Sequence, residues 1–323
     1  MLIISEDIAR DLVSAGDAIT EVERCFAAMA RGKARNYPVV RETVGVNDAV
    51  YGVKSGCDTD AGILGLKAGG YWPHNASHGV GNHQSSTLLF DPATGRASAL
   101  VSANYLTGVR TGASSAIASK YLSRKDARVL GMIGTGGQAG YQLRATLQVR
   151  NLTIVHAWDP VEENLARFGE TVRDLGLEFH GHADRASVVQ AADIVVTVTP
   201  SQAALIERSW VRAGTHISAM GADTKGKQEL DTALVADAAL FYDELDQTRT
   251  IGEFQHAFGE GLIRTDDMRG SIGQVIAGMV PGRRSDEEIT IFDGTGVALQ
   301  DLVVAELAVR LAEEKGLGVK VDY

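Results

Sequence analysis

A glycine-rich turn lies near the middle of the 323-residue chain, directly after an apolar run. Its residues are Gly134-Thr135-Gly136-Gly137-Gln138-Ala139, and they match the pattern G-x-G-x-x-A. The run before it, Arg128–Ile133, predicts a buried strand, and the residues after it predict a helix. In this setting Gly134 permits a tight turn, and Gly136 lets the backbone approach a pyrophosphate. The free N–H groups of the helix start favour an anion, so the motif predicts a dinucleotide-binding site.

A carboxylate follows the next predicted strand, Leu152–Trp158. Asp159 at this place can accept hydrogen bonds from the adenosine ribose hydroxyls, and its charge repels a 2′-phosphate. We therefore expect NAD rather than NADP as the cofactor. Asp159 also precedes Pro160, a pair typical of a helix that begins at Pro160, so a capping role stays open beside the ribose contact.

Four charged residues stand among small or apolar neighbours. Lys67 lies inside the apolar run Leu64–Gly70, where a lysine is unfavourable unless it is paired or faces a cleft. Arg110 comes one turn after a predicted helix start, and Arg41 lies in a short alternating run. Asp223 follows a predicted parallel strand, at the edge where open α/β sheets bind ligands. Because arginine presents a planar fork to carboxylates, this set suits a small anionic substrate.

Plainer explanations of the same residues stay open. Arg41 can pair with Glu42 on a surface strand, and Lys67 can be a charge that protects an edge strand from aggregation. Asp223 can cap a loop, and His83 is more often a hydrogen-bonded structural residue than a catalyst. Residue type alone does not separate these explanations from a substrate site.

Composition limits the partners of the chain. The formal net charge is -10 and the pI is about 5.3, which disfavours nucleic acid and anionic membranes as partners. No apolar stretch is long enough to cross a bilayer, and the N-terminus lacks a signal-peptide pattern. Cys25 and Cys57 lack the spacing of a disulfide framework, so a cytoplasmic protein with free thiols is expected. Histidine and cysteine show no paired ligand spacing, so no metal site is predicted.

The predicted helices and strands are arranged differently in two parts of the chain. The first third mixes helical and alternating patterns, which predicts an α+β domain. Its expected helices are Glu6–Leu12, Ala15–Arg31 and Leu106–Leu122, and its expected strands are Val39–Val44, Val50–Lys54, Leu64–Gly69, Thr87–Phe90 and Ala97–Val101. From Arg128 onward strands and helices alternate, which predicts parallel βαβ units. The later expected strands are Ile194–Thr199, His216–Met220, Ala239–Tyr242 and Glu288–Phe292, with helices at Val161–Leu175 and Val297–Lys315.

The expected fold class is therefore α/β, with two domains. A Rossmann dinucleotide-binding domain is expected at residues 123–301. A final strand within Gly316–Tyr323 is expected to return to the first domain. The α+β domain is therefore expected to be discontinuous and to comprise residues 1–122 and 302–323.

Several stretches together resemble the ornithine cyclodeaminase/mu-crystallin family. The matching stretches are Leu66-Lys67, Leu88–Gly95, Leu106–Thr111, Gly134–Ala139, Gly221–Glu229 and Phe292–Asp301. They occur in the family's order and extend over most of the chain. The resemblance implies a homodimer, a first domain that carries the substrate and dimer contacts, and a Rossmann domain that holds NAD(P).

The resemblance also implies roles for single residues. Arg41, Lys67 and Arg110 match the residues that hold the substrate carboxylate. Asp223 matches the acid or base that serves the substrate nitrogen, so Lys67 and Asp223 are the expected catalytic residues. The residues expected near the nicotinamide are Thr111, Thr199 and Gln300.

Within the family, the resemblance favours members that are reductases. Asn82-His83-Gln84 resembles their His-Gln pair, so His83 and Gln84 are expected substrate contacts. Three further stretches resemble bacterial iminosuccinate reductases of the β-hydroxyaspartate route of glyoxylate assimilation: Lys67–Asn75, Asp223–Asp231 and Ile251–His256. This implies NADH-dependent reduction of a small imino acid, iminosuccinate, to L-aspartate. Lys54, His83 and Gln84 are candidates for binding its second carboxylate.

Three other functions remain alternatives because the family includes them. Ornithine cyclodeamination forms L-proline and ammonia and consumes no net NADH. Alanine dehydrogenation acts on an amino acid with one carboxylate. A crystallin-like protein binds NAD(P) or another small ligand without turnover.

Overall fold

The computed structural model describes residues 1–322, apart from the side chain of Ala76, and divides into two compact units. Unit 1 comprises Met1–Arg110 and Val297–Tyr323, and unit 2 comprises Thr111–Gly296. Tyr323, the last residue of the expected C-terminal strand, lies outside the described residues. The sequence placed the two boundaries after residues 122 and 301. Helix α3 (Asn104–Leu122) runs through the first boundary, and its continuous helical pattern gives no sign of a division.

Unit 1 is built on a mixed sheet. Its strands are β1 (Leu2–Ile4), β2 (Ala34–Asn36), β3 (Val40–Thr43), β4 (Val50–Asp58), β5 (Ile63–Tyr71), β6 (His83–Phe90), β7 (Ala97–Ser102) and β18 (Val319–Lys320). Their order is β18-β1-β7-β6-β5-β4-β2, and β3 also pairs with β4. Neighbours from β4 to β7 are antiparallel, and β18 pairs with β1. The C-terminal segment thus returns to the first strand, as the sequence predicts.

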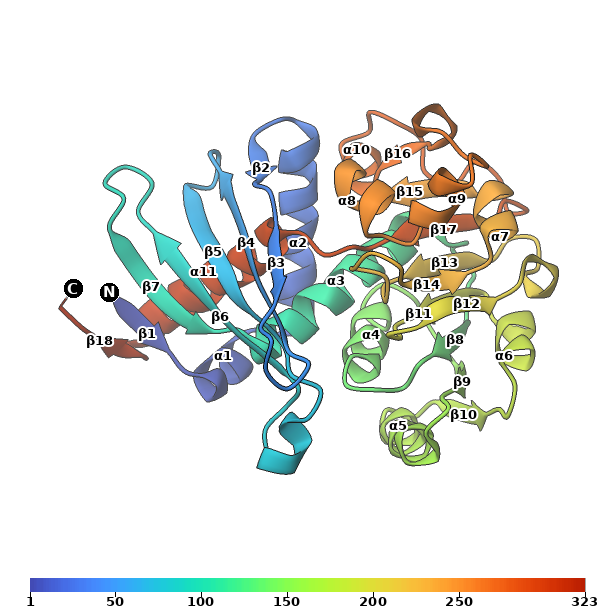
Figure 1. The fold of residues 1–323 in the computed structure, drawn as a ribbon, viewed down its shortest axis with the longest axis horizontal. Helices are drawn as coiled ribbons and strands as arrows, with labels where there is room; N and C mark the ends of the chain where they lie inside the picture. The colour runs from blue at the N-terminus through green and yellow to red at the C-terminus, as the bar shows by residue number, and fades with distance from the viewer. Residues whose placement is uncertain (323) are drawn as a thin grey trace. The chain divides into compact units, whose positions relative to one another are not determined.

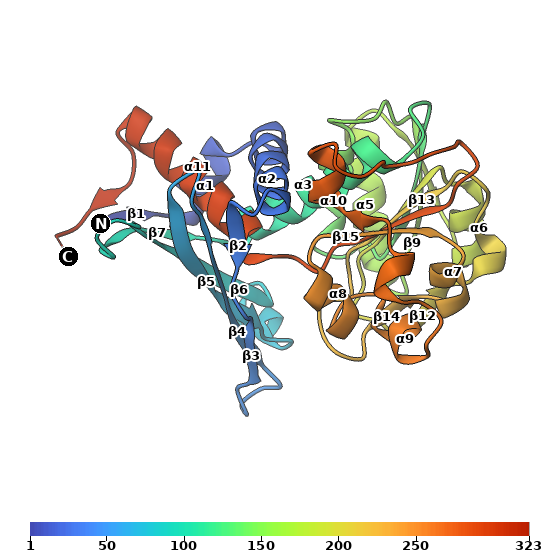
Figure 2. The same cartoon turned by 90° about the horizontal axis from the view of Figure 1, so that it is seen from above.

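A long C-terminal helix covers one face of this sheet. The helices of unit 1 are α1 (Glu6–Leu12), α2 (Ala15–Ala30), η1 (Asn75–His78) and α11 (Ala298–Lys315). Helix α11 packs against β4, β5 and β6 and lies beside α2 (Figures 1 and 2). A Cβ atom at Gly65 would lie 3.0 Å from Leu302 Cδ2, and one at Gly56 would lie 3.3 Å from Leu299 Cγ. These two glycines therefore let α11 approach the sheet closely.

Unit 2 is built on a parallel sheet. Its strands are β8 (Val129–Ile133), β9 (Ile154–Trp158), β10 (Glu178–Gly181), β11 (Ile194–Thr197), β13 (His216–Ala219), β15 (Ala239–Tyr242), β16 (Gly270–Ser271) and β17 (Thr290–Asp293). Their order is β10-β9-β8-β11-β13-β17-β15-β16 (Figure 1). The chain reverses its direction of travel across the sheet between β8 and β11, which is where such folds bind ligands. A separate parallel pair is formed by β12 (Gln202–Ile206) and β14 (Gln228–Leu230).

Short helices connect the strands of unit 2. They are α4 (Ala139–Thr146), α5 (Glu162–Asp174), α6 (Arg185–Ala191), η2 (Arg208–Trp210), α7 (Thr232–Ala236), α8 (Leu245–Thr250), α9 (Gln255–Gly259), η3 (Thr265–Asp267) and α10 (Ile272–Ile276). All residues of β11, β13 and β17 are buried, which explains why most of them are apolar or small; His216 and Asp293 are ionisable exceptions. The predicted fold class, a Rossmann domain with a discontinuous α+β domain, is confirmed.

Element ends differ from the sequence patterns mainly in unit 1. Strand β4 continues four residues beyond the predicted Lys54, to Asp58, and β6 starts at His83 rather than Thr87. These extensions contain glycine, serine or histidine, which weaken a strand pattern without preventing pairing. Among the described residues, no helix combines the length and the apolar character that a membrane crossing requires.

Candidate functional site

Four predicted site residues follow four neighbouring strands of unit 2. Gly134 follows β8, Asp159 follows β9, Thr199 lies two residues after β11, and Asp223 comes after β13. These strands are adjacent and parallel, so their carboxyl ends share one edge of the sheet. That edge is the ordinary ligand side of an open α/β sheet.

The glycine turn combines one crowded and two open positions. Gly134 has φ +91°, and a Cβ there would lie 2.7 Å from Thr199 Cγ2. Only glycine fits this conformation and this contact. A Cβ at Gly136 or Gly137 would meet no atom within 4 Å. The backbone therefore stays uncovered just before α4, where a pyrophosphate could bind its N–H groups.

Asp159 fastens the glycine turn to the end of β9. Its Oδ2 accepts hydrogen bonds from Thr135 N at 2.6 Å and from Thr135 Oγ1 at 3.0 Å. Its Oδ1 accepts one from Val161 N at 2.8 Å. Helix α5 begins at Glu162, so the suggested helix start at Pro160 is wrong, because Asp159 and Pro160 form a turn before the helix.

A buried glutamate holds two further loops at the same edge. Glu229 accepts hydrogen bonds from Thr197 Oγ1 at 2.6 Å, Thr199 N at 2.7 Å and Gly221 N at 2.9 Å. Burial raises the pKa of Glu229, although the bonds from Thr197 and Thr199 oppose the rise. Glu229 therefore fixes the loop that carries Thr199 and the start of the loop that carries Asp223.

Asp223 is paired with a lysine in its own loop. Its Oδ1 accepts from Lys227 Nζ at 2.7 Å and from Thr224 Oγ1 at 3.1 Å. Lys227 Nζ also donates to Gly221 O at 3.2 Å. The carboxylate is partly exposed, so a small ligand can reach it.

Unit 1 contains a buried group of two cations around one carboxylate. Asp301 Oδ1, on α11, lies 2.9 Å from Lys67 Nζ of β5 and 2.9 Å from Arg110 Nε of α3. Lys67 Nζ also donates to Thr107 Oγ1 at 3.2 Å, and Arg110 Nη1 donates to Gln300 Oε1 at 2.9 Å. Lys67 and Arg110 are each 7% exposed and Asp301 is 2% exposed. The structure therefore brings together three predicted residues, Lys67, Arg110 and Gln300.

The electrostatics of this group favour an added anion. Burial lowers the pKa of Lys67, with contributions from Arg110 and Arg41, while Asp301 opposes the change. Burial alone would raise the pKa of Asp301. The charges of Arg110, Lys67 and Lys54 outweigh burial and hold the pKa of Asp301 below its ordinary value. Four cations, Lys67, Arg110, Lys54 and Arg41, therefore act on this buried group.

The remaining predicted substrate residues lie on the strands of unit 1. Arg41 is exposed on β3, opposite Gly52 of β4. His83 begins β6 and pairs with Tyr71. Gln84 donates through Nε2 to Gly81 O at 2.9 Å and accepts from Asn104 Nδ2 at 3.1 Å.

Thr111, which is expected near the nicotinamide, is buried in α3 and belongs to unit 2.

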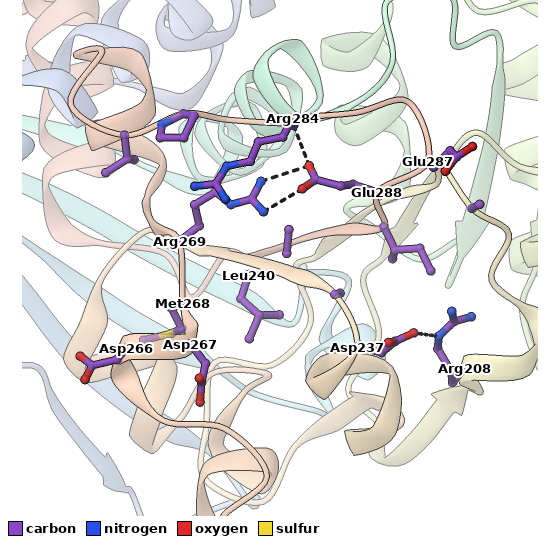
Figure 3. A pocket seen from close by; sticks show the side chains of 16 residues that line it. Arg208, Asp237, Leu240, Asp266, Asp267, Met268, Arg269, Arg284, Glu287 and Glu288 are labelled. Carbon is purple, nitrogen blue, oxygen red and sulfur yellow. Dashed lines mark hydrogen bonds and ion pairs between the residues drawn. The ribbon is translucent and has the colours of Figure 1, made fainter.

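A cavity of about 710 Å³ in unit 2 lies away from all these residues. Its charged lining includes Arg208, Asp237, Arg269 and Glu288 (Figure 3). Arg269 binds both oxygens of Glu288, and Arg208 pairs with Asp237. The cavity opens at the amino ends of β15 and β17, the edge opposite the glycine turn. None of the predicted site residues lines it, so we do not place the chemistry there.

Nearly the whole chain matches a known family. A model described as the ornithine cyclodeaminase/mu-crystallin family matches residues 1–316. The chain belongs to this family. Membership agrees with the resemblance found in the sequence, and it covers both units of the fold.

Relatives within the ornithine cyclodeaminase/mu-crystallin family cover the full chain. The chain is 51% identical over 323 residues to the iminosuccinate reductase of Paracoccus denitrificans, with 100% of both covered. The crystal structure of that enzyme in complex with NAD+ has a TM-score of 0.95 at 50% identity, covering 100% of this chain and 99% of that chain.

Two other solved members of the family are nearly as similar in fold. The Thermococcus litoralis Δ1-pyrroline-2-carboxylate reductase, in complex with NADH and L-proline, has a TM-score of 0.95 at 31% identity, covering 99% of this chain and 100% of that chain. An archaeal alanine dehydrogenase dimer with bound NAD has a TM-score of 0.94 at 36% identity, covering 100% and 99%. All three proteins have the same fold as this chain over nearly their full length.

Sequence reasoning missed the roles of two buried acids in this family member. In the sequence, Asp301 and Glu229 stand out only as the last residues of two stretches that resemble the family. Asp301 lies in an apolar helix pattern, where a lone carboxylate needs partners. That signal, together with a lysine in an apolar strand, could have suggested the pairing with Lys67.

Proposed function

We propose that this protein is an NADH-dependent imine reductase that converts iminosuccinate to L-aspartate. The observation that carries the proposal is the 51% identity to an iminosuccinate reductase across the entire length of both chains. The buried cation group of unit 1 and the glycine turn of unit 2 supply the two binding functions that such a reaction needs.

NAD is the cofactor, and the residues of unit 2 suit it. Gly136 and Gly137 leave the backbone open for a pyrophosphate, and Gln138 Oε1 is buried with no hydrogen-bond partner among the described residues. Asp159 stands where a ribose would bind, and its charge disfavours a 2′-phosphate. When bound, reduced NAD supplies the hydride that the imine carbon accepts.

Lys67 and Arg110 bind the carboxylate next to the imine carbon in this proposal. Arg110 can present two N–H groups to that carboxylate, and Lys67 adds a point charge. Asp301 keeps both cations in fixed positions, since it contacts each at 2.9 Å. Fixing the substrate in this way reduces the entropy lost on reaching the reactive geometry. Arg41 contributes a further positive charge at the sheet surface.

Asp223 serves the substrate nitrogen in this proposal. A protonated imine accepts hydride more readily than a neutral one, and a carboxylate beside it stabilises the positive nitrogen. The reaction consumes one proton and one hydride, and the product amine keeps the nitrogen. In the free protein the proposed acid or base is paired with an ammonium, because Lys227 Nζ lies 2.7 Å from Asp223 Oδ1.

We further propose that the protein is a homodimer. Apolar side chains on one face of the unit 1 sheet are exposed in the single chain, among them Val40 and Tyr51. Exposed apolar side chains on one sheet are typical of an interface between subunits. Light scattering coupled to size-exclusion chromatography tests this, and a monomer at micromolar concentration would overturn it.

The test of the activity is a substrate panel with the purified protein and NADH. Oxaloacetate with ammonia supplies iminosuccinate, and pyruvate or glyoxylate with ammonia supplies imines with one carboxylate. We expect the highest kcat/KM for oxidation of NADH with iminosuccinate and L-aspartate as the product. Replacing NADH by NADPH should lower the rate.

Three outcomes contradict the proposal. Conversion of L-ornithine to L-proline without net use of NADH would indicate a cyclodeaminase. A preference for the pyruvate imine would indicate an alanine dehydrogenase. Tight binding of NADH without turnover of any imine would indicate a binding protein.

A further inference from the structure

The pairing of β4 and β5 places two lysines side by side. Lys54 is directly opposite Lys67 in the antiparallel register. Residues in this relation point to the same face of a sheet, with Cβ atoms about 4.5–5.5 Å apart, and like charges there are destabilising. An arrangement that lowers stability in the free protein is typical of a functional site.

The neighbouring row of residues on the same face consists of Arg41 on β3 and two glycines, Gly52 on β4 and Gly69 on β5. Arg41 pairs with Gly52, and Gly52 pairs with Gly69, so these three residues lie on the face that carries Lys54. A Cβ at Gly69 would lie 2.5 Å from Ser85 Cβ, and one at Gly52 would lie 2.7 Å from Val40 O. Only glycine fits at these two positions, because a Cβ would collide with the neighbouring strands, so no side chain stands beside the lysine pair in this row.

The charges of Lys54 and Arg41 act on the buried ion pair of Lys67 and Asp301. Lys54 contributes to the lowered pKa of Asp301, and Arg41 contributes to the lowered pKa of Lys67. Asp301 is the one carboxylate that the pKa shifts of Lys67 identify as its partner. Two of these cations, Lys67 and Lys54, stand in one row of the sheet, so the row can meet two carboxylates.

Lys54 is better placed for a second carboxylate than His83 or Gln84. The side-chain nitrogen of Gln84 is bonded to Gly81 and its oxygen to Asn104 of α3, so both polar atoms are already used. His83 pairs with Tyr71, four residues along β5 from Lys67, which is about 13 Å at the rise of a strand. The two carboxylates of a four-carbon acid are much closer together than that. Lys54, in the same row as Lys67, matches the short separation.

We propose that Lys54 binds the distal carboxylate of a four-carbon dicarboxylate imine and selects this substrate over imines with one carboxylate. The inference rests on the proposed function and assigns the residue that sets its substrate class. Lys67 and Arg110 then hold the carboxylate beside the imine carbon, so the two lysines of one row bind opposite ends of the same molecule.

The test compares two substrates in the same variants. Lys54→Met keeps the length of the side chain and removes the charge, and Lys33→Met is the matched control because Lys33 is exposed on the same unit. In Lys54→Met we expect kcat/KM for iminosuccinate to fall about 10- to 100-fold, mainly through KM, which corresponds to one lost charged hydrogen bond. The value for the pyruvate imine should stay the same or rise. Lys54→Arg should restore part of the preference.

The control readout is thermal stability. Lys54→Met should melt close to the temperature of the wild type, because the repulsion from Lys67 and the attraction to Asp301 are lost together. If this variant does not fold, Lys54→Gln takes its place in the same comparison. Equal losses for both substrates, or no change for either, would overturn the inference. A wild-type enzyme that does not reduce iminosuccinate would instead overturn the proposed function.

Discussion

Asp301 offers the sharpest test of how unit 1 is held together. Asp301→Asn keeps the shape of the side chain and an acceptor oxygen, and removes the negative charge between Lys67 and Arg110. Each cation lies 2.9 Å from Oδ1. At an effective dielectric constant of 20, one such contact is worth about 6 kcal/mol before desolvation is subtracted. Loss of one partner from a buried ion pair lowers the free energy of unfolding by about 3–5 kcal/mol.

Thermal unfolding of the ligand-free protein measures this loss. A decrease of this size corresponds to a fall in Tm on the order of 10 °C for a unit of this length. Asp60→Asn is the matched control, because Asp60 is exposed in the same unit. Succinate or L-aspartate should raise the Tm of Asp301→Asn more than that of the wild type, since an added carboxylate replaces the missing one. A variant that melts like the Asp60→Asn control would refute the view that Asp301 neutralises the two cations.

Three further predictions concern unit 2. Gly136→Ala should leave Tm unchanged, because its Cβ meets no atom within 4 Å, yet calorimetry should show NADH binding weakened roughly tenfold. Asp159→Ser should lower the preference for NADH over NADPH roughly 10- to 100-fold in steady-state kinetics, since it removes the carboxylate at the ribose position. Burial raises the pKa of Asp293 to about 8, so the folded protein keeps a proton that the unfolded chain releases near pH 4. The free energy of unfolding should fall as pH rises from about 4 to 8, and Asp293→Asn should remove up to about 1.4 kcal/mol per pH unit of that slope in denaturant titrations.

Local patterns were sufficient to predict the cofactor turn. The glycine turn, the strand before it and the acidic residue after the next strand all lie within residues 128–159, where each requirement acts on near neighbours. The crowding of Gly134 against Thr199 involves a distant strand, but the need for glycine at φ +91° is local. Short polar strands such as β10 could not be predicted. An exposed edge strand of four residues does not show the alternation of apolar and polar residues that indicates a strand.

The substrate group was only partly predictable, for a different reason. Lys67 and Arg110 stood out because charges in apolar or small-residue settings need partners. Their partner, Asp301, is 234 residues from Lys67 along the chain, and no pattern within one helix or strand indicates such a pairing. The register that places Lys54 opposite Lys67 was also out of reach, since it depends on where the turn between β4 and β5 begins.

Overall charge and local charge are independent in this protein. The chain carries a formal charge of -10, which predicts an acidic surface and gives no sign of an anion site. In the proposed site one buried carboxylate, Asp301, holds two cations, and the register of β4 and β5 adds Lys54. Carboxylates elsewhere act in the same supporting way, as Glu229 does for the backbone N–H of Thr199. We therefore expect that an acidic protein can bind a dianion. Its buried carboxylates hold cations and backbone N–H groups in place, and the carboxylates of the substrate then bind to those cations.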